Sequence, residues 1–156
     1  MYISEHISYK EVIRSSTAVR LGIANIPNSE QLENIKLIAE KVFEPLRNFF
    51  GKKIYISSFF RCVLLNTKIG GAENSQHCAL KGEAAIDLDA DVFKGLENFQ
   101  IFRFIKENLK FDKLIWEFGD FNNPAWVHVS YNKDNNRNII LISYKKGKKT
   151  KYINYE

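Results

Sequence analysis

The last third of the chain carries three β-rich runs that are joined by very short polar connections. The runs are FDKLIWEF, AWVHVSY and NIILISY, at residues 111–118, 125–131 and 138–144. The connections GDFNNP and NKDNNR are rich in Gly, Asn and Pro, which favour turns. A crossover between consecutive parallel strands needs about a dozen residues or more, so these runs are predicted to form an antiparallel meander.

The first two thirds of the chain combine helical and extended patterns. Apolar residues recur at helical spacing over 29–49 and again over 93–109, and a shorter serine-capped helix is predicted within 8–16. Residues 52–60 are rich in β-branched and aromatic residues, and residues 84–91 alternate between apolar and acidic, so both segments are predicted to be strands. The expected fold class is α+β, with an antiparallel sheet packed against helices.

The length of 156 residues suits one domain, and we find no internal repeat or linker. The first residues, MYISEHISYK, contain neither the basic region nor the apolar region of a secretory signal. No window approaches the roughly 18 uninterrupted apolar residues of a membrane-spanning helix. We therefore expect synthesis in the cytoplasm without a signal peptide, and no membrane insertion.

The positive charge is concentrated at the end of the sequence. The net charge is +5, and the segment 145–156 holds five lysines and one glutamate, which leaves the rest of the chain near +1. A body so close to neutral, without a basic–aromatic motif, argues against a nucleic-acid-binding protein. The segment 145–156 is interpreted either as a solvated tail or lysine-rich edge hairpin, or as a region attracted to a polyanion.

Two histidines and an acidic strand supply candidate metal ligands. His77 ends the polar loop SQH, His128 lies in the run AWVHVSY, and Asp87, Asp89 and Asp91 alternate between them. Two imidazoles and one carboxylate can bind zinc and leave a fourth position for water. The alternative is a buried, hydrogen-bonded histidine together with acidic residues on a solvated strand edge.

Glu117 lies between Trp116 and Phe118. This carboxylate is either on a solvent-facing side of its strand or in an apolar pocket, where burial would raise its pKa and suit a general base. To share a face with His128, Glu117 must pair with it directly or at an even offset across the hairpin.

Four ordered blocks carry a resemblance to a known family. The blocks are SSFFRCVLLNTKIGGAENSQH, KGEAAIDLDAD, LIWEFGD and PAWVHVSY. Together they resemble the zinc peptidoglycan peptidases, which include D-Ala-D-Ala carboxypeptidases and L-Ala-D-Glu endopeptidases and share the hedgehog fold. The opening SSTAVRLGIANIP is similar to the short phage and bacterial forms.

The resemblance implies a role for each matching residue. His77, Asp87 and His128 would bind Zn²⁺, and Glu117 would be the catalytic base. Arg61 would meet a substrate carboxylate or the developing oxyanion.

Ser75 and Trp126 would support the site by packing or hydrogen bonding. The loop between His77 and Gly82 is a few residues longer than the family pattern, so Asp89 remains an alternative to Asp87 as the third ligand.

The resemblance also implies a substrate and a setting. The substrate would be a peptidoglycan stem peptide, and the setting phage lysis or wall remodelling, with the enzyme acting at the cell wall after its release. The segment 145–156 could attract anionic wall polymers. A zinc-containing binding module of the same fold, without hydrolytic activity, is the alternative.

Overall fold

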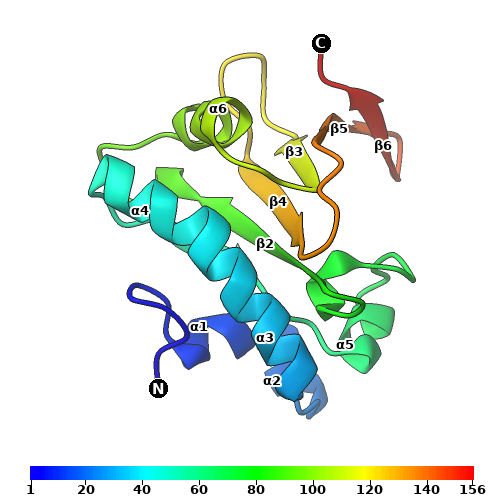
Figure 1. The fold of residues 1–156 in the computed structure, drawn as a ribbon. Coiled ribbons are helices and arrows are strands. Elements are labelled where there is room, and N and C mark those ends of the chain that lie inside the picture. Colours follow the sequence, from blue (N-terminus) through cyan, green and yellow to red (C-terminus); the bar gives the residue numbers. More distant parts are fainter.

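The computed structural model describes residues 1–156, and it forms a single domain in which helices pack against a six-stranded sheet (Figure 1). In chain order the elements are α1 (Tyr9–Ile13), α2 (Ser16–Leu21), α3 (Ser29–Ile38), η1 (Ala39–Phe43), α4 (Glu44–Phe50), β1 (Tyr55–Ser58), α5 (Val63–Lys68), η2 (Gln76–Cys78), β2 (Glu83–Asp89), η3 (Ala90–Val92), α6 (Asn98–Asn108), β3 (Lys113–Glu117), β4 (Trp126–Asn132), β5 (Ile139–Lys146) and β6 (Lys149–Asn154). The expected α+β class is confirmed.

The sheet is mixed, so the expected antiparallel meander is wrong. Its strand order is β1-β2-β4-β3-β5-β6, and every neighbouring pair is antiparallel except β3 and β5, which are parallel. The chain leaves β4, passes the start of β3 and adds β5 on the far side of β3. A short connection suffices because β3 and β5 are not consecutive: β4 lies between them in the sequence and reverses the direction.

One continuous helical segment packs against the sheet and runs alongside β2, as Figure 1 shows for α3 and α4. It begins at Asn28, whose side chain accepts from the Gln31 amide in a capping box, and it ends at Gly51 in the left-handed conformation. The predicted helix over 29–49 is therefore confirmed, with one π-helical turn, η1, in its middle. Its buried stripe includes Ile35, Val42 and other core residues of the helix-covered face.

The two faces of the sheet have different roles. Ile86, Leu88, Val127 and Val129 point to one face and belong to the core beneath the helices. Side chains of β2 and β4 at the alternate positions, such as Asp87, point to the other face. The sheet therefore separates a dry core from a face that is free to carry polar groups.

The two other helix predictions differ in their outcome. The short serine-capped helix predicted within 8–16 is confirmed as α1, which Ser8 caps, and Ser15 caps a separate helix, α2. The helix predicted over 93–109 begins only at Asn98, because Gly95 adopts a positive φ of 96° that a helix cannot contain.

The strand predicted over 84–91 does not include all three aspartates. Asp87 lies within β2, Asp89 is its last residue, and Asp91 lies in the 3₁₀ turn η3. The buried Asn98 side chain donates to the carboxylates of both Asp89 and Asp91. These two acids therefore anchor the start of α6.

The lysine-rich end forms a hairpin at the edge of the sheet. Strand β6 pairs with β5 in register from Leu141↔Asn154 to Lys146↔Lys149, with Gly147 in the turn. The structure therefore contains the edge hairpin and not a solvated tail, while attraction to a polyanion stays a prediction. None of the helices combines the length and apolar character needed to cross a membrane.

A buried carboxylate ties the turn before β2 to the second half of the sheet. Asp112 accepts two hydrogen bonds from the Arg137 guanidinium, at 2.8 and 2.7 Å, and one from Gln76 Nε2 at 2.7 Å. Hydrogen bonds from Arg137, despite burial of the carboxyl group, lower the pKa of Asp112 to about 2. Because Gln76 directly precedes His77, this network also fixes the turn that carries the histidine.

Replacing this carboxylate should destabilise the fold in a pH-dependent way. The folded-state pKa of Asp112 lies below its unfolded value, so its contribution is complete above about pH 4 and disappears as the pH falls towards 2. We expect Asp112→Asn to lower the free energy of unfolding by about 2 kcal/mol at pH 7, with a smaller difference near pH 2. Urea unfolding across this pH range measures it. The exposed Asp134→Asn is the control, and an equal loss at pH 7 and pH 2 would contradict the prediction.

Candidate active site

A polar cleft of about 750 Å³ opens on the sheet face opposite the helices. Its lining comes from the η2 turn, from β2, β3 and β4, and from the β5–β6 hairpin. Of the residues predicted from the sequence, it gathers those that carry chemistry: Arg61, His77, Asp87, Glu117 and His128.

The η2 turn fixes the His77 ring. Ser75 caps the turn through its side chain, and Ala79 ends it in the left-handed conformation. The ring is 4% exposed, and its Nδ1 lies 2.7 Å from the carbonyl oxygen of Phe59. A carbonyl can only accept, so Nδ1 carries a proton and Nε2 is the nitrogen that faces the cleft.

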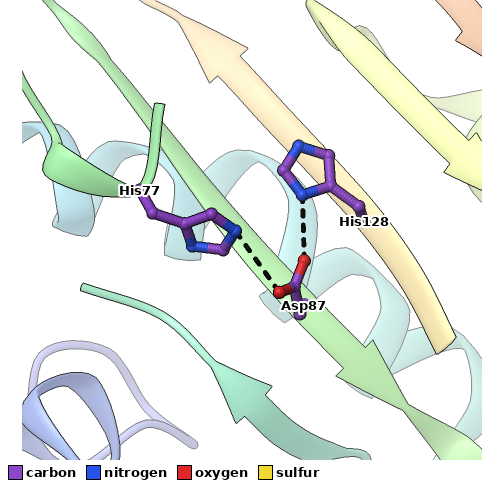
Figure 2. Close-up of side chains that lie close together, drawn as sticks. All are labelled: His77, Asp87 and His128. Carbon is purple, nitrogen blue, oxygen red and sulfur yellow. Dashed lines mark hydrogen bonds and ion pairs between the residues drawn. The ribbon is translucent and has the colours of Figure 1, made fainter. Parts of the chain in front are cut away.

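Asp87 lies between the two histidines (Figure 2). It is paired directly with His128 in the β2–β4 register, and its Oδ1 lies 2.9 Å from His128 Nδ1. Its other oxygen, Oδ2, lies 3.3 Å from Nε2 of His77. One ligand atom from each of the three residues can be chosen so that all lie within 4.8 Å of one another.

The contact between His77 and Asp87 is suited to a cation. With Nδ1 protonated, Nε2 and the carboxylate oxygen Oδ2 face each other with lone pairs unless a proton or a metal ion lies between them. Two imidazole nitrogens and one carboxylate are a zinc donor set that leaves a position open. The hydrogen bond to the Phe59 carbonyl is the kind of outer partner that orients a metal-binding histidine. The residues present therefore fit Zn²⁺.

Electrostatics keeps Asp87 ionised. Burial by itself would raise its pKa, but the charge and hydrogen bonds of His77 and His128 outweigh burial and hold the pKa of Asp87 well below its usual range. Asp89, the alternative ligand, points elsewhere and accepts from the Asn98 side chain and the Asp91 amide. Geometry therefore brings Asp87, and not Asp89, to the histidines.

Glu117 lies on the same sheet face as the histidine of β4. It pairs with Trp126, and Ile115 pairs with His128, so Glu117 and His128 are offset by two residues. Only 7% of Glu117 is exposed, and burial raises the pKa of its carboxyl group. Ser143 Oγ donates to Oε2 of Glu117 and partly offsets this effect.

Arg61 lies at the other side of the cleft. Its backbone amide donates to the carbonyl of His77 at 3.0 Å, and its Nη2 donates to Ser75 Oγ at 3.1 Å. Its Nε is buried and has no hydrogen-bond partner. Burial lowers the pKa of Arg61, while the charge of Asp87 opposes that shift.

Sequence reasoning missed the contribution of the last two strands. Ser143 in β5 is 1% exposed, binds Glu117 and accepts from the Phe118 amide at 3.2 Å. Tyr152 in β6 pairs with Ser143 and lines the cleft, as does Lys145. The sequence did contain a signal for this contact: Ser143 is a serine within the apolar run NIILISY. A hydroxyl that is buried in such a run needs a hydrogen-bond partner.

Comparison with known families agrees with this geometry. A sequence model of the family described as Peptidase M15 matches residues 5–130, well over half of the chain. The chain belongs to the Peptidase M15 family. This match confirms the family resemblance of the four sequence blocks and indicates a metallopeptidase. The match includes every predicted site residue, whereas β5 and β6 of this M15 protein lie beyond it. A search of curated proteins gives no match.

Metal titration tests the candidate donor set without depending on activity. We expect Asp87→Asn to weaken Zn²⁺ binding by more than the roughly 10- to 100-fold that outer partners of a metal site contribute. Asp89→Asn is the matched control and should bind Zn²⁺ as the wild type does. Competition with a chromophoric chelator measures the affinities. Equal loss in both variants, or in neither, would contradict the assignment.

Proposed function

We propose that this M15 protein is a zinc-dependent peptidase that hydrolyses a peptide bond in peptidoglycan stem peptides. The observation that carries the proposal is the convergence of His77, Asp87 and His128 beside the buried Glu117. A set of metal donors next to a carboxylate of raised pKa is the arrangement that metal-assisted hydrolysis requires.

Each donor of the centre would have a defined part. His77 would bind the metal through Nε2, since Nδ1 is occupied by the Phe59 carbonyl. Asp87 and His128 would supply the other two donors from neighbouring strands. Zinc bound there would act as a Lewis acid and lower the pKa of water towards neutrality.

Glu117 would act as the general base. Its raised pKa makes the carboxylate a stronger base. It can then accept a proton from water and return that proton to the leaving amine. The Ser143 hydroxyl holds one carboxylate oxygen, Oε2, and leaves Oε1 for proton transfer. Arg61 is charged and planar, so it would bind a substrate carboxylate or stabilise the developing oxyanion.

The finer identity of the activity is also a proposal. Stem peptides carry carboxylates at D-Glu and at the D-Ala end, which suit a cleft containing Arg61 and Lys145. A D-Ala-D-Ala carboxypeptidase and an L-Ala-D-Glu endopeptidase both fit this chemistry. We place the enzyme in phage lysis or wall remodelling, made in the cytoplasm and acting at the wall after its release.

Hydrolysis of purified peptidoglycan tests the proposal. We expect the zinc-loaded protein to release fragments whose masses identify the bond, and chelation to abolish cleavage until zinc is restored. Glu117→Gln should lower kcat by about 10²- to 10⁴-fold, because the base is lost, while zinc stoichiometry is unchanged. A folded, zinc-loaded protein that cleaves no stem peptide would instead support the non-catalytic binding module.

The hydroxyl of Ser143 should tune the base. Its hydrogen bond stabilises the charged carboxylate, so Ser143→Ala should raise the pKa of Glu117 further. Because the base must be ionised, the acid limb of the kcat/KM profile should move upward by about one pH unit. Ser143→Thr keeps a hydroxyl and serves as control. An acid limb that stays in place in the alanine variant would exclude this role.

The edge hairpin is proposed to attract anionic wall polymers. Deleting 145–156 would remove Tyr152 from the cleft, so neutralising substitutions are the sharper test. We expect the combined change Lys146→Gln, Lys148→Gln and Lys149→Gln to reduce sedimentation with polymer-bearing walls by about tenfold at low salt.

Two controls accompany the hairpin experiment. The three distant changes Lys10→Gln, Lys41→Gln and Lys110→Gln remove the same charge from other exposed sites. Turnover of a small soluble peptide should be unchanged in both triple variants. Equal loss of wall binding in both would show that net charge alone, and not the hairpin, is responsible.

A further inference from the structure

A second hollow adjoins the cleft on the far side of Arg61. It has a volume of about 290 Å³ and lies between the α2 N-terminal segment, β1 and α5. Arg61 and Ile69 line both this hollow and the cleft with the histidines, so the two hollows are neighbours on the surface.

All charged residues that line the hollow are positive. Its only ionised side chains are Arg14 and Arg61, and no aspartate or glutamate lines it. Neither arginine takes part in a salt bridge. Six further lining residues carry hydroxyl groups, among them Ser57 and Ser58 of β1. Two unneutralised guanidinium groups among hydroxyl donors form an environment for an anion.

Arg14 is held in place rather than loosely solvated. Its guanidinium lies over the Tyr55 ring, with Cζ at 4.7 Å from the ring centroid, and its Nη2 donates to the Ile56 carbonyl at 2.5 Å. Cation–π stacking and a backbone hydrogen bond both restrict the side chain. An arginine fixed before a ligand arrives loses less entropy on binding it.

Arg61 offers an unused donor at the boundary of the two hollows. Nη2 is engaged by Ser75, but Nε is buried without a partner. A buried donor with no partner is costly, and a ligand oxygen that reached Nε would satisfy it. The hollow also adjoins the candidate metal centre through β1, since Ser58 is paired with Asp87 in the sheet.

From these observations we propose that the hollow is a carboxylate subsite, in which Arg14 and Arg61 bind a carboxylate of the substrate while its scissile bond lies at the candidate metal centre. The proposal rests on the proposed peptidase function and deepens it. The small volume admits a carboxylate on a short branch or at a chain end, and planar guanidinium groups match its two oxygens. Arg14 is then a specificity-determining residue for anionic peptides.

Binding to an inactive variant tests the subsite separately from hydrolysis. In zinc-loaded Glu117→Gln protein, isothermal titration would use the stem pentapeptide L-Ala-γ-D-Glu-L-Lys-D-Ala-D-Ala. Two matched ligands carry an amide in place of either the D-Glu α-carboxylate or the terminal carboxylate. We expect one of the two amides to bind at least about tenfold more weakly than the parent, which identifies the carboxylate that occupies the hollow.

Substitution of Arg14 shows whether this residue binds the carboxylate that the amides identify. Arg14→Gln should weaken binding of the parent peptide about tenfold, yet leave the affinity of the weakly binding amide unchanged. Arg14→Lys, which keeps the charge, should recover part of the loss. Arg20→Gln, an exposed arginine of α2 outside the hollow, is the matched control and should have no effect.

The outcomes separate the subsite from the proposed function. Equal weakening of all three ligands by Arg14→Gln, or no weakening of any, overturns the subsite. If the carboxylate dependence is found but the wild type cleaves no stem peptide, the subsite stands and the peptidase function fails. Circular dichroism melting of each variant shows whether it is folded under the titration conditions.

Discussion

The direct pairing of Asp87 with His128 across β2 and β4 is the contact on which the site depends. The same face of the next strand carries Glu117, two residues out of register with the histidine. Side chains alternate between faces, so a slip of one residue in either ladder would move a site residue into the helix-covered core. The apolar residues of the opposite face, such as Ile86 and Val129, oppose that slip because burying them stabilises the register.

Much of this arrangement could be predicted from the sequence, because it depends on local patterns. The alternation in β2 follows from strand periodicity alone. For Glu117 and His128 the sequence supplied only the condition for sharing a face, and the strand pairing shows the offset of two residues. The family resemblance then gave each residue a candidate role. The sequence could not decide between Asp87 and Asp89, since the two are separated by one strand period. The structure separates them through Asn98, which draws Asp89 towards the start of α6.

Long-range features were not predictable in the same way. Strand β5 joins the sheet beside β3 and not beside β4, because the chain passes the start of β3 near the Asp112–Arg137 pair. No local pattern encodes that choice of neighbour. The contact between Ser143 and Glu117 could not be predicted for the same reason. Only the parallel pairing of β3 and β5 places the Ser143 hydroxyl opposite Glu117. The late start of α6 is a local feature, and Gly95 was the signal for it in the sequence.

The order of the elements along the chain has a consequence during biosynthesis. The candidate metal donors span residues 77–128, but the partner of Glu117 is at position 143 and one wall of the cleft is at 152. A nascent chain emerging from the ribosome exposes the donors first, and its cleft stays open on one side until β5 and β6 have emerged and paired. Assembly of the complete cleft therefore follows the emergence of β5 and β6.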